Sequence, residues 1–212
     1  MFTAFKTHSA NSRPFLATIV LPLALVLMSH VAVAQDQDVA GAQDHQLFAR
    51  YSGSVIIGYD YKGLDEFALP VGPVFLNARP KRQHLEGKVT RILYLGAPGQ
   101  SSLEVFRHYE LASKKLAGLK VLFECSRDQC GEWNGAALPQ SLLSNRELRN
   151  SVVAAQAFGG YPADIRYLSA SAPTENGEVY LSLAVGLQSH DREQAGRVLT
   201  LLEVIETKAP SR

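Results

Sequence analysis

The residues best suited to acid–base chemistry are Asp44 and His45, which stand next to each other in the chain. A carboxylate can orient an imidazole that acts as a general base, so the pair could serve a small hydrolase-type enzyme. The same two side chains could instead fix a turn by hydrogen bonding to the nearby backbone. We favour the turn, and we keep Asp44, His45 and the nearby Arg50 as candidate binding residues.

His84 is the second candidate for acid–base chemistry, because His84-Leu-Glu86 has the spacing of the His-x-Glu motif of zinc deaminases. The closely spaced cysteines that complete that motif are missing, so a chance match is the better interpretation. Asp65 and Glu66 are adjacent carboxylates, but neighbours on a strand point to opposite faces. They are therefore badly placed to share one substrate.

Other motifs for catalysis or cofactor binding are missing from the sequence. It contains no nucleophile elbow, phosphate loop or dinucleotide fingerprint. The histidines after residue 34 lie in separate segments, and no pair has the spacing of metal ligands. These are His45, His84, His108 and His190. We therefore expect no catalytic residue, no metal site and no cofactor.

Trp133 is the single tryptophan of the chain and stands between Gly131 and Gly135. A tryptophan on a constrained loop could stack on a ligand or a partner. It could equally pack over the core beneath that loop. The sequence leaves both readings open, and Trp133 joins the candidate binding residues.

The two cysteines of the chain are Cys125 and Cys130. An even number of cysteines in an exported chain favours a disulfide. A redox-active pair usually has two intervening residues, whereas this pair has four, and no histidine nearby could complete a zinc site. We expect a structural disulfide that closes a small loop.

Residues 1–34 have the features of a cleaved signal peptide. Basic residues precede an almost unbroken apolar stretch from Phe15 to Met28, and Ala32-Val33-Ala34 offers the small-x-small pattern that signal peptidase requires. A retained membrane anchor is the alternative, but Pro22 interrupts the stretch and no basic stop-transfer cluster follows it. We expect cleavage after Ala34, a periplasmic location and no membrane span in the remaining chain.

The net charge of the chain argues against nucleic acid as a partner. Cleavage would change the net charge from +1 for 212 residues to −1 for the remaining 178, because the removed segment holds Lys6 and Arg13 and no acid. A near-neutral chain has no electrostatic footprint for nucleic acid and no general attraction to an anionic membrane. Positive charge does gather in the run from Arg79 to Arg82. Such a run is usually just solvated, and an anionic ligand is the alternative.

Hydrophobic periodicity predicts seven strands and two helices. The predicted strands are residues 54–61, 67–74, 89–95, 119–124, 165–170, 179–187 and 198–206. Prolines make the predicted strand 67–74 an edge strand or an irregular piece. The predicted strand 198–206 is apolar on both sides, which favours a central position in the sheet. Capping boxes predict helices that begin at Ser101 and Ser144, and glycines end them at Gly118 and Gly159.

These elements predict one α+β domain over residues 44–207. We expect a largely antiparallel sheet with the two helices on one face, and one compact β-α-β unit across residues 89–124. Residues 35–43 are polar and are expected to form a flexible N-terminus, and residues 208–212 a polar tail.

Several phrases of the sequence form a familiar series. They include Asp44-His45, Ala49-Arg50-Tyr51-Ser-Gly53, Leu85-Glu86-Gly87, Val121-Leu-Phe-Glu-Cys125 and Gly177-Glu-Val-Tyr180. Over most of residues 38–207 the series resembles an uncharacterised domain-of-unknown-function family of Gram-negative envelope proteins. The resemblance implies an envelope location and a partner there, either an envelope protein or a cell-wall component. Members often carry an OmpA-like peptidoglycan-binding module after this domain, and we find no fingerprint of that module in these 212 residues.

Two functional hypotheses follow. The first is a periplasmic binding or assembly module without catalytic activity, acting through a sheet edge or the loop around Trp133. The alternative is a small periplasmic hydrolase-type enzyme using Asp44 and His45, or His84. We favour the first because the sequence shows no assembled catalytic set. It carries no signal for an oligomeric state.

Overall fold

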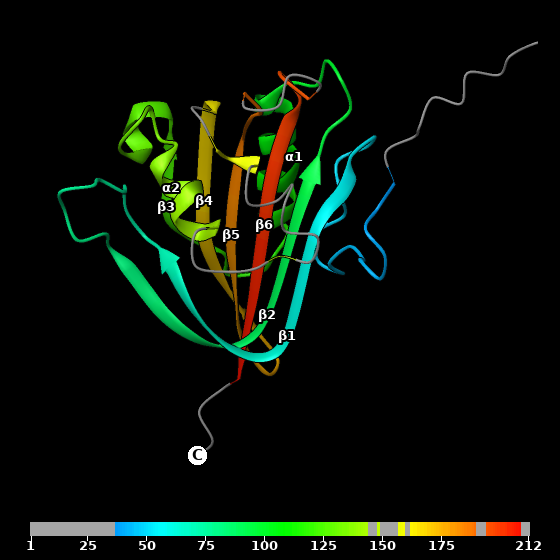
Figure 1. Cartoon of the computed structure of the whole chain (residues 1–212). Coiled ribbons are helices and arrows are strands. Elements are labelled where there is room, and N and C mark those ends of the chain that lie inside the picture. Colours follow the sequence, from blue (N-terminus) through cyan, green and yellow to red (C-terminus); the bar gives the residue numbers. More distant parts are fainter. Residues whose placement is uncertain (1–36, 144–147, 149–156, 160–161, 190–193, 209–212) are drawn as a thin grey trace, which may run out of the picture. The chain divides into compact units, whose positions relative to one another are not determined.

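The computed structural model describes residues 37–143, 148, 157–159, 162–189 and 194–208. These residues form six strands, two α-helices and one short 3-10 turn (Figure 1). In chain order they are β1 Val55–Pro70, β2 Arg82–Leu95, α1 Ser102–Ser113, β3 Lys120–Ser126, η1 Arg127–Cys130, α2 Ala137–Leu143, β4 Ala163–Thr174, β5 Gly177–Leu187 and β6 Val198–Lys208. The predicted α+β class is confirmed.

All six strands belong to one antiparallel sheet with the order β1-β2-β6-β5-β4-β3. The predicted central place of the last strand is confirmed, because β6 lies between β2 and β5. Strand, helix and strand do follow one another in β2, α1 and β3. Three other strands separate β2 from β3 in the sheet, however, so a compact β-α-β unit is not confirmed.

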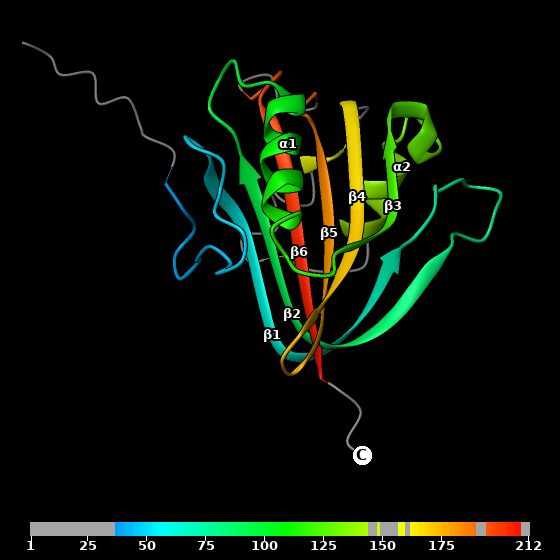
Figure 2. The same cartoon turned by 180° about the vertical axis from the view of Figure 1, so that it is seen from behind.

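The two helices lie on opposite faces of the sheet, and the expectation that both cover one face is wrong (Figures 1 and 2). Successive side chains of a strand point to opposite faces, so a strand that is apolar throughout needs cover on both sides. In β6, Leu202 packs in the cluster that includes α1, whereas Leu201 packs in the cluster that includes α2. We call these two sides of the sheet the α1 face and the α2 face.

The β1–β2 hairpin bends so that one pair of strands contributes to both faces. The predicted strand 54–61 and the first four residues of the predicted strand 67–74 belong to one strand, β1, which continues to Pro70 through a bulge between Lys62 and Asp65. Beyond the bulge, Phe67 and Leu85 are buried in the α2-face cluster. Figure 1 shows the hairpin curling across the sheet. Gly87 permits this bend, because a Cβ there would come within 2.5 Å of the Glu206 carbonyl oxygen.

Helix α1 begins where the sequence predicted, one residue after Ser101, but the predicted capping bond is missing. The Ser101 side chain makes no cap hydrogen bond. The Ser102 hydroxyl instead donates to the carboxylate of Asp164 on β4. The tertiary contact with β4 therefore anchors the start of the helix.

Helix α2 was not predicted as a helix. The helix predicted from Ser144 to Gly159 lies almost entirely outside the described residues, and its buried Leu148 is one of the few described positions. Pro139 sits in the first turn of α2, where a missing backbone N–H costs nothing because that group has no helical partner.

The predicted disulfide between Cys125 and Cys130 is confirmed, and it joins the end of β3 to the end of η1.

Candidate functional site

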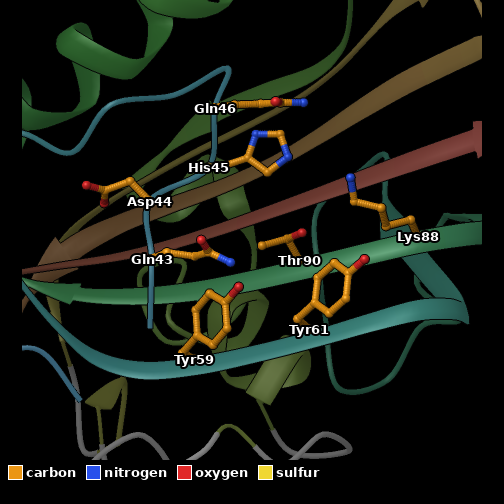
Figure 3. Close-up of a pocket in the computed structure, with 8 residues that line it drawn as sticks. All are labelled: Gln43, Asp44, His45, Gln46, Tyr59, Tyr61, Lys88 and Thr90. Carbon is orange, nitrogen blue, oxygen red and sulfur yellow. The ribbon is translucent and has the colours of Figure 1, made fainter. Parts of the chain in front are cut away.

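A polar pocket of about 180 Å³ opens on the α1 face, at the β1–β2 end of the sheet (Figure 3). Two strands and the segment that precedes β1 supply its walls. The lining residues are Gln43, Asp44, His45, Gln46, Tyr59, Tyr61, Lys88 and Thr90. We call this the His45 pocket.

Strand alternation explains how β1 and β2 supply this wall. Tyr59 and Tyr61 are two residues apart on β1, and Lys88 and Thr90 are two apart on β2, so each pair points to one side of the sheet. Tyr61 and Thr90 are direct partners in the β1–β2 register. Tyr59 is 5% exposed, whereas the ring of Tyr61 remains half open to solvent.

The segment before β1 is held over the sheet by ion pairs centred on Arg50. Its guanidinium donates to Asp38 at 2.7 and 2.8 Å and to Asp44 at 2.8 and 2.9 Å. Asp38 also accepts a 2.8 Å bond from the Ile56 amide of β1, and Tyr94 donates to Asp44 at 2.9 Å. The bonds from Arg50 lower the pKa of Asp38 and outweigh the opposing effect of burial.

His45 is buried beneath this segment, and both of its ring nitrogens have partners. The Leu47 amide donates to Nδ1 at 3.3 Å. Nδ1 therefore carries no proton, and Nε2 donates to Glu206 Oε1 at 3.1 Å. Burial lowers the pKa of His45, against the opposing influence of Glu206, so the ring is neutral at pH 7.

Glu206 links His45 to the strands. Lys88 Nζ donates to both of its carboxylate oxygens, at 2.7 and 2.9 Å. Lys88 and Glu206 are direct partners across β2 and β6. Burial alone would raise the pKa of Glu206, but the bonds from Lys88 and His45 outweigh it and lower that pKa. The Lys88 charge at the pocket wall is thus neutralised by a carboxylate.

The alternative considered for Asp44 and His45, a carboxylate that orients a histidine base, is absent from the geometry. Figure 3 shows the Asp44 carboxylate turned away from the His45 ring, and it is bonded to Arg50 and Tyr94 instead. His45 has no free lone pair with which to accept a substrate proton. The hypothesis of a local turn fits better, because the Leu47 amide bonds to the ring of His45 two residues before it.

The other residues that the sequence singled out lie elsewhere. His84 is exposed on the far half of β2, opposite Ala68 of β1. The Nε2 atom of His108 on α1 lies 2.9 Å from the Ala49 carbonyl oxygen, a bond that ties the helix to the N-terminal segment. Trp133 is 41% exposed on the loop after the disulfide and does not line the His45 pocket. The candidate binding residues therefore fall into two separate places.

The sequence singled out two of the eight pocket residues, Asp44 and His45. It did not single out the other six, which are Gln43, Gln46, Tyr59, Tyr61, Lys88 and Thr90. The alternation within residues 54–61 does place both tyrosines on one side, which was an available signal. The register that sets Thr90 against Tyr61 and Glu206 against Lys88 depends on long-range pairing.

The described ranges of the chain hold neither a metal cluster nor a spanning helix. Within them, no three His, Cys, Asp or Glu side chains gather closely enough to bind a metal ion. No helix among the same residues is long and apolar enough to cross a bilayer.

Comparison with protein-family models and with curated protein sequences finds no match for this chain. The family resemblance of the sequence therefore stays a prediction.

Proposed function

We propose that this chain is a non-catalytic binding module of the cell envelope, and that the His45 pocket takes an uncharged polar ligand. One observation carries the proposal: the charged and titratable side chains around the pocket already bind one another. Asp44 is paired with Arg50, and His45 and Lys88 are both paired with Glu206. What remains for a ligand is aromatic surface and neutral hydrogen-bonding groups.

The pocket chemistry favours a sugar unit as the ligand. The half-open ring of Tyr61 provides a flat apolar face with a polar tip, and a sugar ring presents a C–H face that can lie against it. The amides of Gln43 and Gln46 and the hydroxyl of Thr90 can exchange hydrogen bonds with sugar hydroxyls. A volume of about 180 Å³ holds roughly six water molecules, which is the scale of a single ring.

The proposed envelope location rests on sequence chemistry. The signal-peptide pattern of residues 1–34 directs the chain out of the cytoplasm. The Cys125–Cys130 disulfide agrees with that route, because such bonds persist in oxidising compartments. A neutral glycan of the cell wall is a ligand available there.

Isothermal titration calorimetry with N-acetylglucosamine oligosaccharides tests this proposal. The wild-type protein should bind, and Tyr61→Ala should weaken binding at least about tenfold, because it removes the stacking face. Leu64→Ala is the matched control, since Leu64 is a 70% exposed apolar residue of the same strand that does not line the pocket. Equal weakening by both substitutions, or no binding by the wild type, would refute the proposal.

The alternative of a hydrolase using Asp44 and His45 predicts a different result. Turnover of a glycan by the wild type and its loss in His45→Gln would support an enzyme. The bonds that occupy both ring nitrogens of His45 argue for intact oligosaccharide after prolonged incubation.

A further inference from the structure

The β1–β2 connection, residues 71–81, meets the loop that follows the disulfide (Figure 1). Val74 of this connection forms a parallel bridge with Gly131 of the loop that follows the disulfide. The Val74 amide donates to the Cys130 carbonyl at 3.0 Å, and the Glu132 amide donates to the Val74 carbonyl at 2.9 Å. Gly131 allows this close approach, because a Cβ there would collide with the Val74 backbone.

This junction exposes three large apolar side chains. Phe75 and Leu76, which follow Val74, are 44% and 62% exposed, and Trp133, two residues after Gly131, is 41% exposed. Leu76 and Trp133 each lie two residues beyond the bridge, on the two loops that it joins. We call Phe75, Leu76 and Trp133 the apolar tip.

The apolar tip is held in place from both sides. The Val71 amide donates to the Lys81 carbonyl at 3.0 Å and closes the base of the first loop, and the Ala78 amide donates to the Phe75 carbonyl at 3.3 Å within it. The disulfide fixes Cys130, the residue at which the second loop begins. Preformed loops lose little conformational entropy when they bind a surface.

Positive charge borders the apolar tip. Residues 71–83 contain Arg79, Lys81 and Arg82 and no acid. Arg79 and Lys81 are exposed, and the hydrogen bonds of Arg82 go to neutral groups, the Ala68 carbonyl and the Ser141 hydroxyl. The second loop adds Asp128 and Glu132, and its Arg127 is paired with Asp164. The combined surface remains net positive.

We propose that the apolar tip inserts into the headgroup region of an anionic phospholipid bilayer, with Arg79 and Lys81 facing the lipid phosphates. Tryptophan, phenylalanine and leucine beside basic residues are the side chains that favour this interface, because rings and aliphatic groups enter the acyl boundary while cations meet phosphate. The basic run and Trp133, which the sequence left without a common role, act together here. The surface is separate from the His45 pocket, so it does not depend on the ligand proposed there.

Trp133 is the single tryptophan of the chain, so its fluorescence reports insertion directly. The exported protein is mixed with vesicles of phosphatidylglycerol or of phosphatidylcholine. Emission should shift to shorter wavelength with phosphatidylglycerol only, and added salt should reverse the shift because it screens the phosphate contacts. A double Arg79→Gln and Lys81→Gln variant should bind roughly 25-fold more weakly, at about fivefold for each removed cation.

A second pair of variants distinguishes insertion of the apolar tip from nonspecific adsorption to the vesicles. Phe75→Ser with Leu76→Ser keeps Trp133 and should lose the shift, whereas Leu64→Ser, at a 70% exposed site outside the tip, should keep it. Circular dichroism confirms that each variant is folded. Equal shifts with both lipids, no shift with phosphatidylglycerol, or a shift that appears without lipid as protein concentration rises would each overturn the proposal. The last result would mean that the tip covers a second copy of the chain.

Discussion

Replacing Arg91 with methionine should strongly destabilise this domain, because it breaks a fully buried ion pair. Arg91 of β2 and Glu203 of β6 form this pair on the α2 face, with 1% and 0% of their side chains exposed. Arg91 Nε donates to Glu203 at 2.8 Å, and its Nη2 donates to the Leu142 carbonyl of α2 at 2.9 Å. Ser182 of β5 donates to the second Glu203 oxygen at 2.9 Å.

The loss in free energy of unfolding depends on which buried groups each substitution leaves without a partner. Arg91→Met strands the Glu203 carboxylate in the core with one remaining donor, which costs about 3–5 kcal/mol. It also removes the donor to the Leu142 carbonyl, which adds roughly 1 kcal/mol or more. Adding Glu203→Leu removes the stranded charge, and Ser182 keeps the Tyr167 hydroxyl 3.3 Å away as a partner. The double variant should therefore recover most of the lost stability.

Urea unfolding followed by far-ultraviolet circular dichroism measures these differences. Arg107→Met is the matched control, because the Arg107 side chain pairs with a glutamate but is 54% exposed, and it should leave the midpoint unchanged. The reasoning is refuted if Arg91→Met costs under about 1 kcal/mol, or if the double variant is less stable than the single one.

Three further predictions concern stability and processing. Burial holds the pKa of folded His45 below 6.5, so the unfolded chain takes up a proton first as pH falls. The free energy of unfolding should therefore decline below about pH 6.5. Urea midpoints compared across pH should show a less steep decline for His45→Gln. Cys125→Ala with Cys130→Ala should lower the free energy of unfolding by about 2 kcal/mol, because the closed loop is short; complete unfolding of this variant would contradict a local role for the disulfide. Intact-mass measurement of the exported protein should give a chain that begins at Gln35, and a mass that includes residues 15–34 would disprove the predicted cleavage.

Local patterns in the sequence were enough to predict much of the fold. The two-sided apolar pattern of residues 198–206 placed β6 in the middle of the sheet. The even number of cysteines in a chain with a signal-peptide pattern predicted the bond between Cys125 and Cys130. Both features depend on residues close together in the chain. The start of α1 was also predicted, although its anchor proved to be Asp164, 62 residues away from Ser102.

Long-range pairing explains what the sequence could not predict. A bulge lets β1 pass through polar residues and continue, so two apparent strands are one. Strand alternation shows that both faces of β6 are apolar but not which helix covers each. The His45 pocket needs Glu206, 161 residues after His45, and the apolar tip needs the bridge between Val74 and Gly131. No local motif encodes either contact.

The central claim is that the His45 pocket binds a neutral sugar without transforming it. Amide chemical-shift mapping of the isotope-labelled protein during titration with N-acetylglucosamine oligosaccharides tests this most directly. We predict saturable shifts that centre on Gln43, Gln46, Tyr61 and Thr90, with the sugar signals showing no cleavage afterwards. Shifts that centre on Phe75 and Trp133, cleavage of the sugar, or an unchanged spectrum would contradict the account.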